Sequence, residues 1–305
     1  MEKFTRNDTW NQTILTSSLS FSNPLLNSSF ACSKLLIAAV LFSTLLSACG
    51  DSHDGRENVL ENEGSEYQLS SSNAKKIQPN DRFVYAINPN AKYDVNLVKV
   101  VFVDLFDQST SSIARLKSQG KTVVCYFSGG SSENWRSDYK QFSSSVKGKK
   151  LDGWNGENWI DYRSTTVRNI MKARIALAIQ KKCDGIDPDN IDGHLNDSGF
   201  NLSAGEQQAY MKFLSTEAHT KNLLIGLKNS AETASKIEPF TDFVVVEECY
   251  KYNECSAYKS FAAHSKAIFS VEYTPYKSSL CGNAGLNKIS LIFSNLNLTS
   301  FKICR

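Results

Sequence analysis

The stretch KVVFVDLFDQSTSSIARLKSQGKTVVCYF, residues 99–127, contains the pattern of one strand–helix–strand unit. Its two apolar runs, Lys99–Asp104 and Thr122–Phe127, are hydrophobic at consecutive positions, which is typical of strands buried on both faces of a parallel sheet. Between them, Ser112–Gln119 has helical spacing and is followed by Gly120, a residue type that commonly ends helices. The stretch therefore predicts a right-handed β-α-β unit.

The same alternation continues along the chain from residue 81. Six further runs are predicted strands: Phe83–Ile87, Gly185–Asp187, Leu223–Leu227, Asp242–Val246, Ala267–Val271 and Ile289–Phe293. Helices are expected after Ser164, and after Ser203, which forms a capping box with Glu206. Eight strands between residues 81 and 305 predict an α/β fold, the (β/α)8 TIM barrel, as a single domain. A doubly wound open sheet is the alternative, but neither G-x-G-x-x-G after the first strand nor G-x-x-x-x-G-K-[ST] occurs.

The composition is that of a soluble globular protein. Of 305 residues, 41% are hydrophobic and 21% are charged, which excludes wholesale disorder and a polytopic membrane protein. The formal net charge is only +3, so electrostatics provides no case for a nucleic-acid partner. We expect a monomer.

The N-terminal part has the features of an export signal. The apolar run Leu35–Leu46 follows Lys34 and ends at Ser47-Ala48-Cys49. It is too short to span a bilayer, which takes about 20 residues. The ending resembles the bacterial lipobox, in which the cysteine is lipidated and becomes the N-terminus. We therefore expect a signal peptide at 1–48, a lipidated Cys49 with a polar tether over 49–80, and a folded domain at 81–305. An ordinary secretory signal is the alternative. The lipoprotein interpretation predicts an exported protein anchored at the outer membrane or cell surface.

Six cysteines fall in the predicted folded domain: Cys125, Cys183, Cys249, Cys255, Cys281 and Cys304. An even number in an exported domain predicts disulfides, although sequence alone does not choose the connectivity. We expect Cys249–Cys255 to close a small loop and Cys281–Cys304 to pin the C-terminus. The pairing of Cys125 and Cys183 stays open. No C-x-x-C pair occurs and the four histidines are scattered, so no metal site or cofactor is predicted.

Polar side chains follow the predicted strands, where barrel enzymes carry their chemistry. They are Asp104, Asp107, Tyr126, Ser128, Asp187, Asp189, Asn190, Asp192, Lys228, Asn229, Glu247, Glu248, Glu272 and Tyr273. Two carboxyl groups across a cleft are the apparatus of glycoside hydrolysis. Single carboxylates at such positions also cap helix N-termini, which is the structural alternative.

The segment Cys125–Arg136, CYFSGGSSENWR, resembles the CYFSAGSYEDWR motif of glycoside hydrolase family GH114, the endo-α-1,4-polygalactosaminidases and their TIM-barrel relatives. The similarity continues in order through LDGWNGENWID (151–161), CDGIDPDNIDG (183–193), GLKN (226–229), EECY (247–250) and VEYT (271–274). The resemblance implies an endo-acting enzyme on α-1,4-linked galactosamine polymers of the biofilm-matrix type, working without a cofactor.

The resemblance also implies the catalytic pair. The family's strand-four aspartate falls on Asp189, expected as nucleophile or base, and its strand-six glutamate on Glu247, expected as acid with a raised pKa. Asp187 competes for the first role, because positions two apart on a strand face the same way. The residues expected to contact the sugar are Asp104, Tyr126, Asp187, Asn190, Lys228, Asn229, Glu272 and Tyr273.

The chain departs from the family at two positions. Tyr85 lies on the first strand, where a tryptophan is common, and Glu248 stands where many relatives have glutamine. Glu248 would raise the pKa of Glu247 if both side chains faced inward.

Two other functions are considered: a non-catalytic polysaccharide-binding lipoprotein, and a deacetylase, which would need a His/Asp metal-ligand set that the sequence does not offer. Cleavage of the polymer, its retention, or release of acetate would distinguish the three.

The lipid anchor gives the first prediction. Changing Cys49 to Ala should release the protein from membranes or block its processing, because the acylated side chain is removed. The measurement is membrane partition after a salt wash, compared between the wild type and the variant. Unchanged partition of the variant would refute the anchor.

Overall fold

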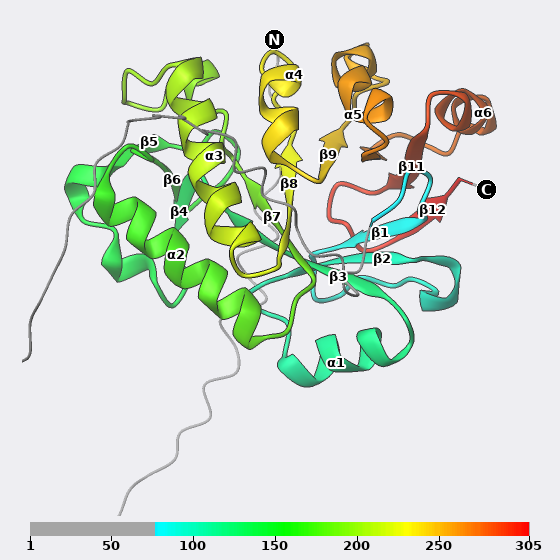
Figure 1. The fold of residues 1–305 in the computed structure, drawn as a ribbon, viewed down its shortest axis with the longest axis horizontal. Coiled ribbons are helices and arrows are strands. Elements are labelled where there is room, and N and C mark those ends of the chain that lie inside the picture. The colour runs from blue at the N-terminus through cyan, green and yellow to red at the C-terminus, as the bar shows by residue number, and fades with distance from the viewer. Residues whose placement is uncertain (1–76, 305) are drawn as a thin grey trace, which may run out of the picture. The chain divides into compact units, whose positions relative to one another are not determined.

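In a computed structural model, residues 77–304 are described, and they form a nearly closed barrel (Figure 1). The nine strands are β1 Phe83–Ala86, β2 Val100–Asp104, β3 Thr122–Ser128, β7 Gly185–Asp189, β8 Leu224–Lys228, β9 Phe243–Glu247, β10 Ala267–Glu272, β11 Ile289–Ser294 and β12 Phe301–Ile303. They lie side by side in chain order. All neighbours are parallel except β12, which runs antiparallel to β11. The eight predicted strands and the barrel are confirmed. The predicted signal peptide, Cys49 and residues 49–76 lie outside the described residues.

The helices follow the strands and lie around the outside of the sheet (Figure 1). They are α1 Thr110–Ser118, α2 Thr165–Gln180, α3 Ala204–His219, α4 Ala234–Ile237, α5 Lys259–Ala263 and α6 Ser278–Leu286. Helix α1 begins two residues before its expected start because the Ser109 hydroxyl caps it, accepting from Ser112 N at 3.1 Å. The predicted capping box of Ser203 and Glu206 is present on α3. No helix within residues 77–304 is long and apolar enough to cross a bilayer.

The strands are buried on both faces, and this produces two apolar cores. Alternate residues of the strands point into the barrel, where the rings of Phe83, Phe102, Phe243 and Phe269 pack together. The Phe83 and Phe269 ring centroids are 4.7 Å apart. The intervening residues pack against the helices. Ile77, which the sequence placed in the tether, is buried in the interior cluster and so packs with the domain.

The barrel closes through the segment that follows β11 rather than through a ladder between its edge strands. The Asn88 side-chain amide, just after β1, donates to Asn297 O at 2.7 Å. Lys92 N donates to Thr299 O at 2.9 Å, and Lys92 forms an isolated bridge with Ser300. The turn between β11 and β12 therefore joins the two edges.

A small antiparallel sheet, which the sequence did not predict, is inserted between β3 and α2. Its strands are β4 Ser131–Glu133, β5 Lys147–Lys150 and β6 Glu157–Ile160, in the order β4-β6-β5. It starts within three residues of the end of β3 and so lies beside the C-terminal end of the barrel, where catalytic groups are expected.

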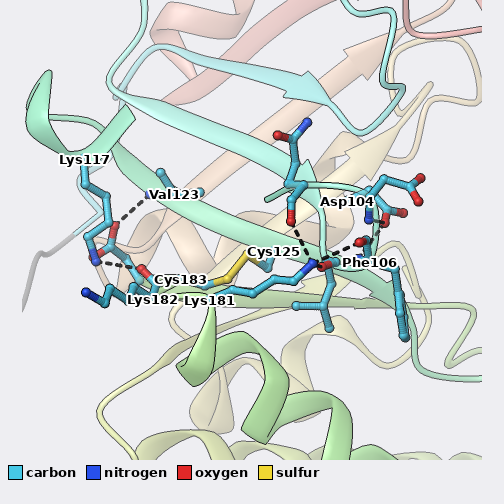
Figure 2. The surroundings of a disulfide bond; sticks show 12 residues. Asp104, Phe106, Lys117, Val123, Cys125, Lys181, Lys182 and Cys183 are labelled. Carbon is cyan, nitrogen blue, oxygen red and sulfur yellow. Dashed lines mark hydrogen bonds and ion pairs between the residues drawn. A yellow bond between two sulfur atoms is a disulfide. The ribbon is translucent and has the colours of Figure 1, made fainter. Parts of the chain in front are cut away.

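Three disulfides connect the described cysteines. Cys249–Cys255 and Cys281–Cys304 are confirmed, and Cys125 pairs with Cys183, the pairing that the sequence left open. Figure 2 shows the side chain of Lys181 beside the Cys125–Cys183 disulfide. Its ammonium donates to the carbonyls of Leu105, Phe106 and Gln108 at 2.7, 2.9 and 2.7 Å. This region therefore ties the end of β2, the middle of β3 and the start of β7 together.

Candidate active site

The inward-facing positions change from apolar to polar at the C-terminal end of the barrel. Above the aromatic interior they carry Tyr85 on β1, Tyr126 on β3, Asp187 and Asp189 on β7, Lys228 on β8 and Glu247 on β9. On β9, the alternation that turns Phe243 and Val245 inward also turns Glu247 inward. The strand register thus gathers side chains from five strands at one level.

Lys228 lies at the centre of this group. Its side chain is only 2% exposed, and its Nζ lies 3.1 Å from Asp189 Oδ2 and 2.7 Å from Glu247 Oε2. Burial alone would lower the pKa of Lys228, but the carboxylates of Asp189, Glu247 and Asp187 raise it overall. The ammonium therefore stays charged and holds the two predicted catalytic carboxyl groups together.

Further donors fix the orientation of Asp189. Its Oδ2 accepts from the Tyr126 hydroxyl at 3.1 Å, and its Oδ1 accepts from Asn190 N at 2.8 Å. The carbonyl of Asp189 accepts from the amides of Gly129 and Gly130 at 2.7 and 2.9 Å. A Cβ at Gly130 would lie 1.6 Å from Asn190 O, so only glycine allows the segment after β3 to approach the segment after β7 this closely.

Glu247 has a corresponding set of partners. Its Oε2 accepts from the Asn229 side-chain amide at 3.3 Å, and its Oε1 accepts from the Tyr273 hydroxyl. The backbone amide of Glu247 donates to Asn229 Oδ1 at 2.9 Å. The predicted residues Asn190, Asn229 and Tyr273 thus lie against the two carboxyl groups.

Asp187 lies beneath Asp189 and is fully buried. Its Oδ2 accepts from the Tyr85 hydroxyl at 2.8 Å, whereas Oδ1 has no hydrogen-bond partner within residues 77–304. Burial raises the pKa of Asp187 to about 7, and Asp189 and Glu247 add to the rise against the opposing effect of Lys228. The two aspartates face the same side, as expected, but only the Asp189 side chain, 16% exposed, reaches solvent.

Glu248 does not face the barrel mouth. It follows Glu247 with a left-handed backbone, φ 56°, and its carboxylate pairs with Lys251 at 2.9 Å. Glu248 was expected to raise the pKa of Glu247 only if both side chains faced inward, and the Glu248 side chain does not. Its charge instead adds to the effect of burial in raising the pKa of Glu272.

Two of the residues expected to contact sugar have other partners. The Asp104 carboxylate is buried and binds the Arg136 guanidinium at 2.5 and 3.0 Å. The Glu272 carboxylate is buried and accepts from Tyr250 N at 3.0 Å. Both side chains hold loops beside the site, and neither joins the group around Lys228.

Several buried charged residues were missed by the sequence analysis, and two of them lie close to the site. Arg174 of α2 donates to Ser128 O at 2.6 Å and to Asp138 Oδ2 at 2.7 Å, so it fixes the end of β3. Its sequence signal is an arginine on the apolar face of a predicted helix. Glu157 of β6 is also buried, and lies within the segment 151–161 without having been singled out.

A groove of about 400 Å³, here called the Trp154 groove, has Asn190, the residue after Asp189, in its lining. The antiparallel insert and the loop after β7 line it, through Lys149, Lys150, Leu151, Asp152, Trp154, Trp159, Asn190, Asp192, Asn196 and Asp197. Its lining combines two tryptophans with three aspartates and two lysines, of which Lys149 pairs with Asp197 at 2.6 Å. Over residues 77–304, no group of three or more His, Cys, Asp or Glu side chains is arranged to hold a metal ion.

Comparisons with known proteins agree with this geometry. The model of the family described as "Glycoside-hydrolase family GH114" matches residues 66–305. The crystal structure of Aspergillus fumigatus Ega3 in complex with galactosamine is 34% identical, with a TM-score of 0.71 over 77% of this chain and 99% of that chain. The glycoside hydrolase domain of PelA from Pseudomonas aeruginosa is 13% identical, with a TM-score of 0.55 over 72% and 97%, and it shares the fold. No curated protein matches the chain.

The burial of Asp187 gives a pH-dependence prediction. Its pKa is about 7 in the folded protein and about 3.9 in an unfolded chain, so between these values the folded state binds more protons. The contribution of Asp187 to stability is therefore fully present below pH ~4 and is lost as the pH rises towards 7. Asparagine does not ionise, so the Asp187→Asn variant does not lose this stability. The melting temperature of the variant minus that of wild type should therefore increase as the pH rises from 4 to 7.

The measurement is thermal unfolding of both proteins across that pH range. Asp152→Asn makes the same chemical change at an exposed turn and serves as the control. A constant difference between Asp187→Asn and wild type across the range would contradict a raised pKa of Asp187.

Proposed function

The chain belongs to glycoside hydrolase family GH114, and from this membership we propose that it is an endo-acting hydrolase of polysaccharides containing α-1,4-linked galactosamine. The observation that carries the proposal is the contact of Asp189 and Glu247 with one buried ammonium at the barrel mouth. Two carboxyl groups in reach of one glycosidic bond are the chemical requirement of this reaction. The complex of Ega3 with galactosamine supports the choice of sugar.

In the proposed mechanism Asp189 is the nucleophile, because donors on both of its oxygens hold it in one orientation. Glu247, whose side chain is 26% exposed, exchanges protons with solvent and acts as the acid. Glu247 protonates the glycosidic oxygen while Asp189 attacks the anomeric carbon, and the C–O bond to the leaving sugar breaks. Water then attacks the glycosyl–Asp189 ester, and Glu247 takes its proton.

The electrostatics of the mouth suit a cationic sugar. Galactosamine carries an ammonium group near neutral pH, and the described site contains three carboxyl groups around a single lysine. Asp187 is only partly ionised near pH 7 and Glu247 holds the proton that it donates, so the Asp189 carboxylate is the group that favours the positive charge developing in the transition state. We propose that the Trp154 groove binds the sugar next to the cleaved bond, by stacking on Trp154.

The location of the protein remains part of the proposal. We propose that the domain acts as a monomer tethered to a membrane through lipidated Cys49, which brings it to extracellular polysaccharide. The support is the sequence Leu46-Ser47-Ala48-Cys49 after an apolar run, together with the polar stretch that follows it.

The shared lysine predicts the stereochemistry. Asp189 Oδ2 and Glu247 Oε2 lie 3.1 and 2.7 Å from the same Nζ. They are therefore less than about 6 Å apart, nearer to the about 5–5.5 Å of retaining enzymes than to the about 6.5–9.5 Å of inverting ones. The first product of an α-linked oligomer should be the α-anomer, as measured by proton NMR before mutarotation. A β-anomer as first product would contradict the covalent role of Asp189.

The catalytic pair is tested with Asp189→Asn and Glu247→Gln. Each should lower kcat on galactosamine polymer by at least about a hundredfold, because a positioned proton donor or nucleophile is lost. Thermal stability should stay near wild type, because each variant leaves Lys228 one carboxylate partner. The matched control is Glu248→Gln, which changes the next residue, whose side chain points away from the mouth. Near-normal cleavage by both variants would refute this catalytic pair, whereas a wild type that retains the polymer without cleaving it would leave the binding-protein function.

A further inference from the structure

Glu157 is a buried carboxyl group beside the active site that the mechanism does not use. It lies on β6, opposite Glu133 of β4, and is only 5% exposed. A sugar in the Trp154 groove or at the barrel mouth therefore does not reach its carboxyl oxygens. Buried carboxyl groups are costly, so the position calls for a physical explanation.

A chain of hydrogen bonds runs from this carboxyl group to Asp189. The Ser131 hydroxyl donates to Glu157 Oε2 at 2.5 Å, and it lies 2.6 Å from the Ser128 hydroxyl. The side-chain amide of Asn190 donates to Ser128 Oγ at 3.0 Å. The backbone amide of Asn190 donates to Asp189 Oδ1 at 2.8 Å. Three residues and four hydrogen bonds thus connect Glu157 with the proposed nucleophile.

The direction of the donors in this chain follows from its contacts. Ser128 Oγ accepts from both the Asn190 side chain and the amide of Ser131, the latter at 3.0 Å. Its own hydrogen is therefore given to Ser131 Oγ, whose hydrogen goes to Glu157. Hydrogen bonds aligned in this way polarise and strengthen one another. Glu157 is the acceptor in which the chain ends.

The hydrogen-bond chain restrains the backbone at Asn190. Asn190 has a left-handed conformation, φ 60°, directly after Asp189. Its side chain turns back to Ser128, while its backbone amide points at the carboxylate of Asp189. Asparagine adopts this conformation more readily than most residues, and its contacts fix it in place. Here the hydrogen bond to Ser128 provides that restraint.

The groups that face Glu157 come from several elements. Glu133 lies on β4, Asp189 on β7 and Tyr126 on β3, and Arg136 follows β4. Burial, Glu133 and Asp189 raise the pKa of Glu157 to about 8, against the opposing effects of Ser131 and Arg136. The raised pKa favours the protonated form of Glu157, which ends the chain as an acceptor without adding a second charge close to Asp189.

The hydrogen-bond chain from Glu157 to Asp189 is not needed to hold the antiparallel insert together. Its strands pair through their backbones, with Ser131 opposite Trp159 and Glu133 opposite Glu157. Arg136 further binds Glu133 at 2.9 Å and Asp104. The serine hydroxyls are thus available for a task other than sheet formation.

We propose that Glu157 is a positioning residue of the glycosidase reaction, which fixes the carboxylate of Asp189 through Ser131, Ser128 and Asn190. The inference rests on the proposed function of Asp189 as nucleophile. Small errors in the placement of a reacting group cost large factors in rate, whereas none of the connecting residues from Glu157 to Ser128 is available to bind sugar. Breaking the chain should therefore lower kcat and leave KM nearly unchanged.

The first test breaks the chain at Ser131. Ser131→Ala should lower kcat on galactosamine polymer about tenfold or more, with KM within about twofold of wild type. The matched control is Ser132→Ala, the next residue of β4, equally buried but bonded to Asn158 O at 3.3 Å rather than to the chain. Equal loss of kcat in the two variants would overturn the proposal.

The second test compares Glu157→Gln with Glu157→Leu. The amide oxygen of glutamine still accepts from Ser131, so its kcat at pH 7 should stay within about threefold of wild type. Leucine accepts nothing, so its kcat should fall as in Ser131→Ala. Rescue by glutamine supports the proposal, and equal impairment of both variants would refute it.

A readout without substrate separates this inference from the proposed function. In the wild type, the NMR signal of the Asn190 side-chain amide should shift with a midpoint near pH 8, as Glu157 ionises. The shift should vanish in Glu157→Gln and Ser131→Ala, and persist in Ser132→Ala. If the wild type cleaves polymer but shows no such shift, the chain does not couple the two groups. A wild type that shows the shift and cleaves no galactosamine polymer contradicts the proposed function instead.

Discussion

The buried ammonium of Lys228 is the constraint on which the rest of the site depends. A buried charge is tolerated only when it is paired and hydrogen-bonded, and Lys228 meets this need through Asp189 and Glu247. Strand β8 lies between β7 and β9, so one ammonium ties the ends of three strands. The register of these strands must therefore bring the two carboxyl groups to the same height.

The aromatic interior of the barrel packs directly beneath Lys228 and its carboxyl partners. Phe83, Phe102, Phe243 and Phe269 fill the barrel below the mouth. Gly226 makes room for this packing, because a Cβ there would lie 2.3 Å from the ring of Phe243. Water is excluded from below, which strengthens the interactions among the charged groups above. The same exclusion explains why Asp187, at the boundary between the two layers, has a raised pKa.

The sequence predicted those features that depend on local pattern. Consecutive apolar residues identified the eight barrel strands, and Ser203 with Glu206 identified a helix start. The antiparallel insert was missed because SSE and KGKK, in β4 and β5, have no apolar alternation, and their pairing depends on distant contacts. The Cys125–Cys183 pairing stayed open for the same reason, since the two residues are 58 positions apart.

Within the site, the prediction depended on which strand face points inward. Spacing by two correctly put Asp187 and Asp189 on one face. Glu272 is different, because its neighbour Val271 packs into the barrel interior, which turns Glu272 outward towards the loop after β9. Asp104 lies on the inward-facing side of β2, as expected, but its charge is neutralised by the Arg136 guanidinium. The two residues are 32 positions apart, and no local sequence pattern reveals such a contact.

In the proposed function, the insert contributes to both sugar binding and catalysis. Its strand β6 carries Glu157, where the hydrogen-bond chain to Asp189 ends, and two residues later Trp159, which lines the Trp154 groove. Positions two apart on a strand share a face, so a change in the groove wall moves the support of the nucleophile. If the groove binds sugar as proposed, we expect substitutions at Trp159 to change kcat as well as KM on galactosamine polymer, and substitutions at Trp154, in the turn before β6, to change mainly KM.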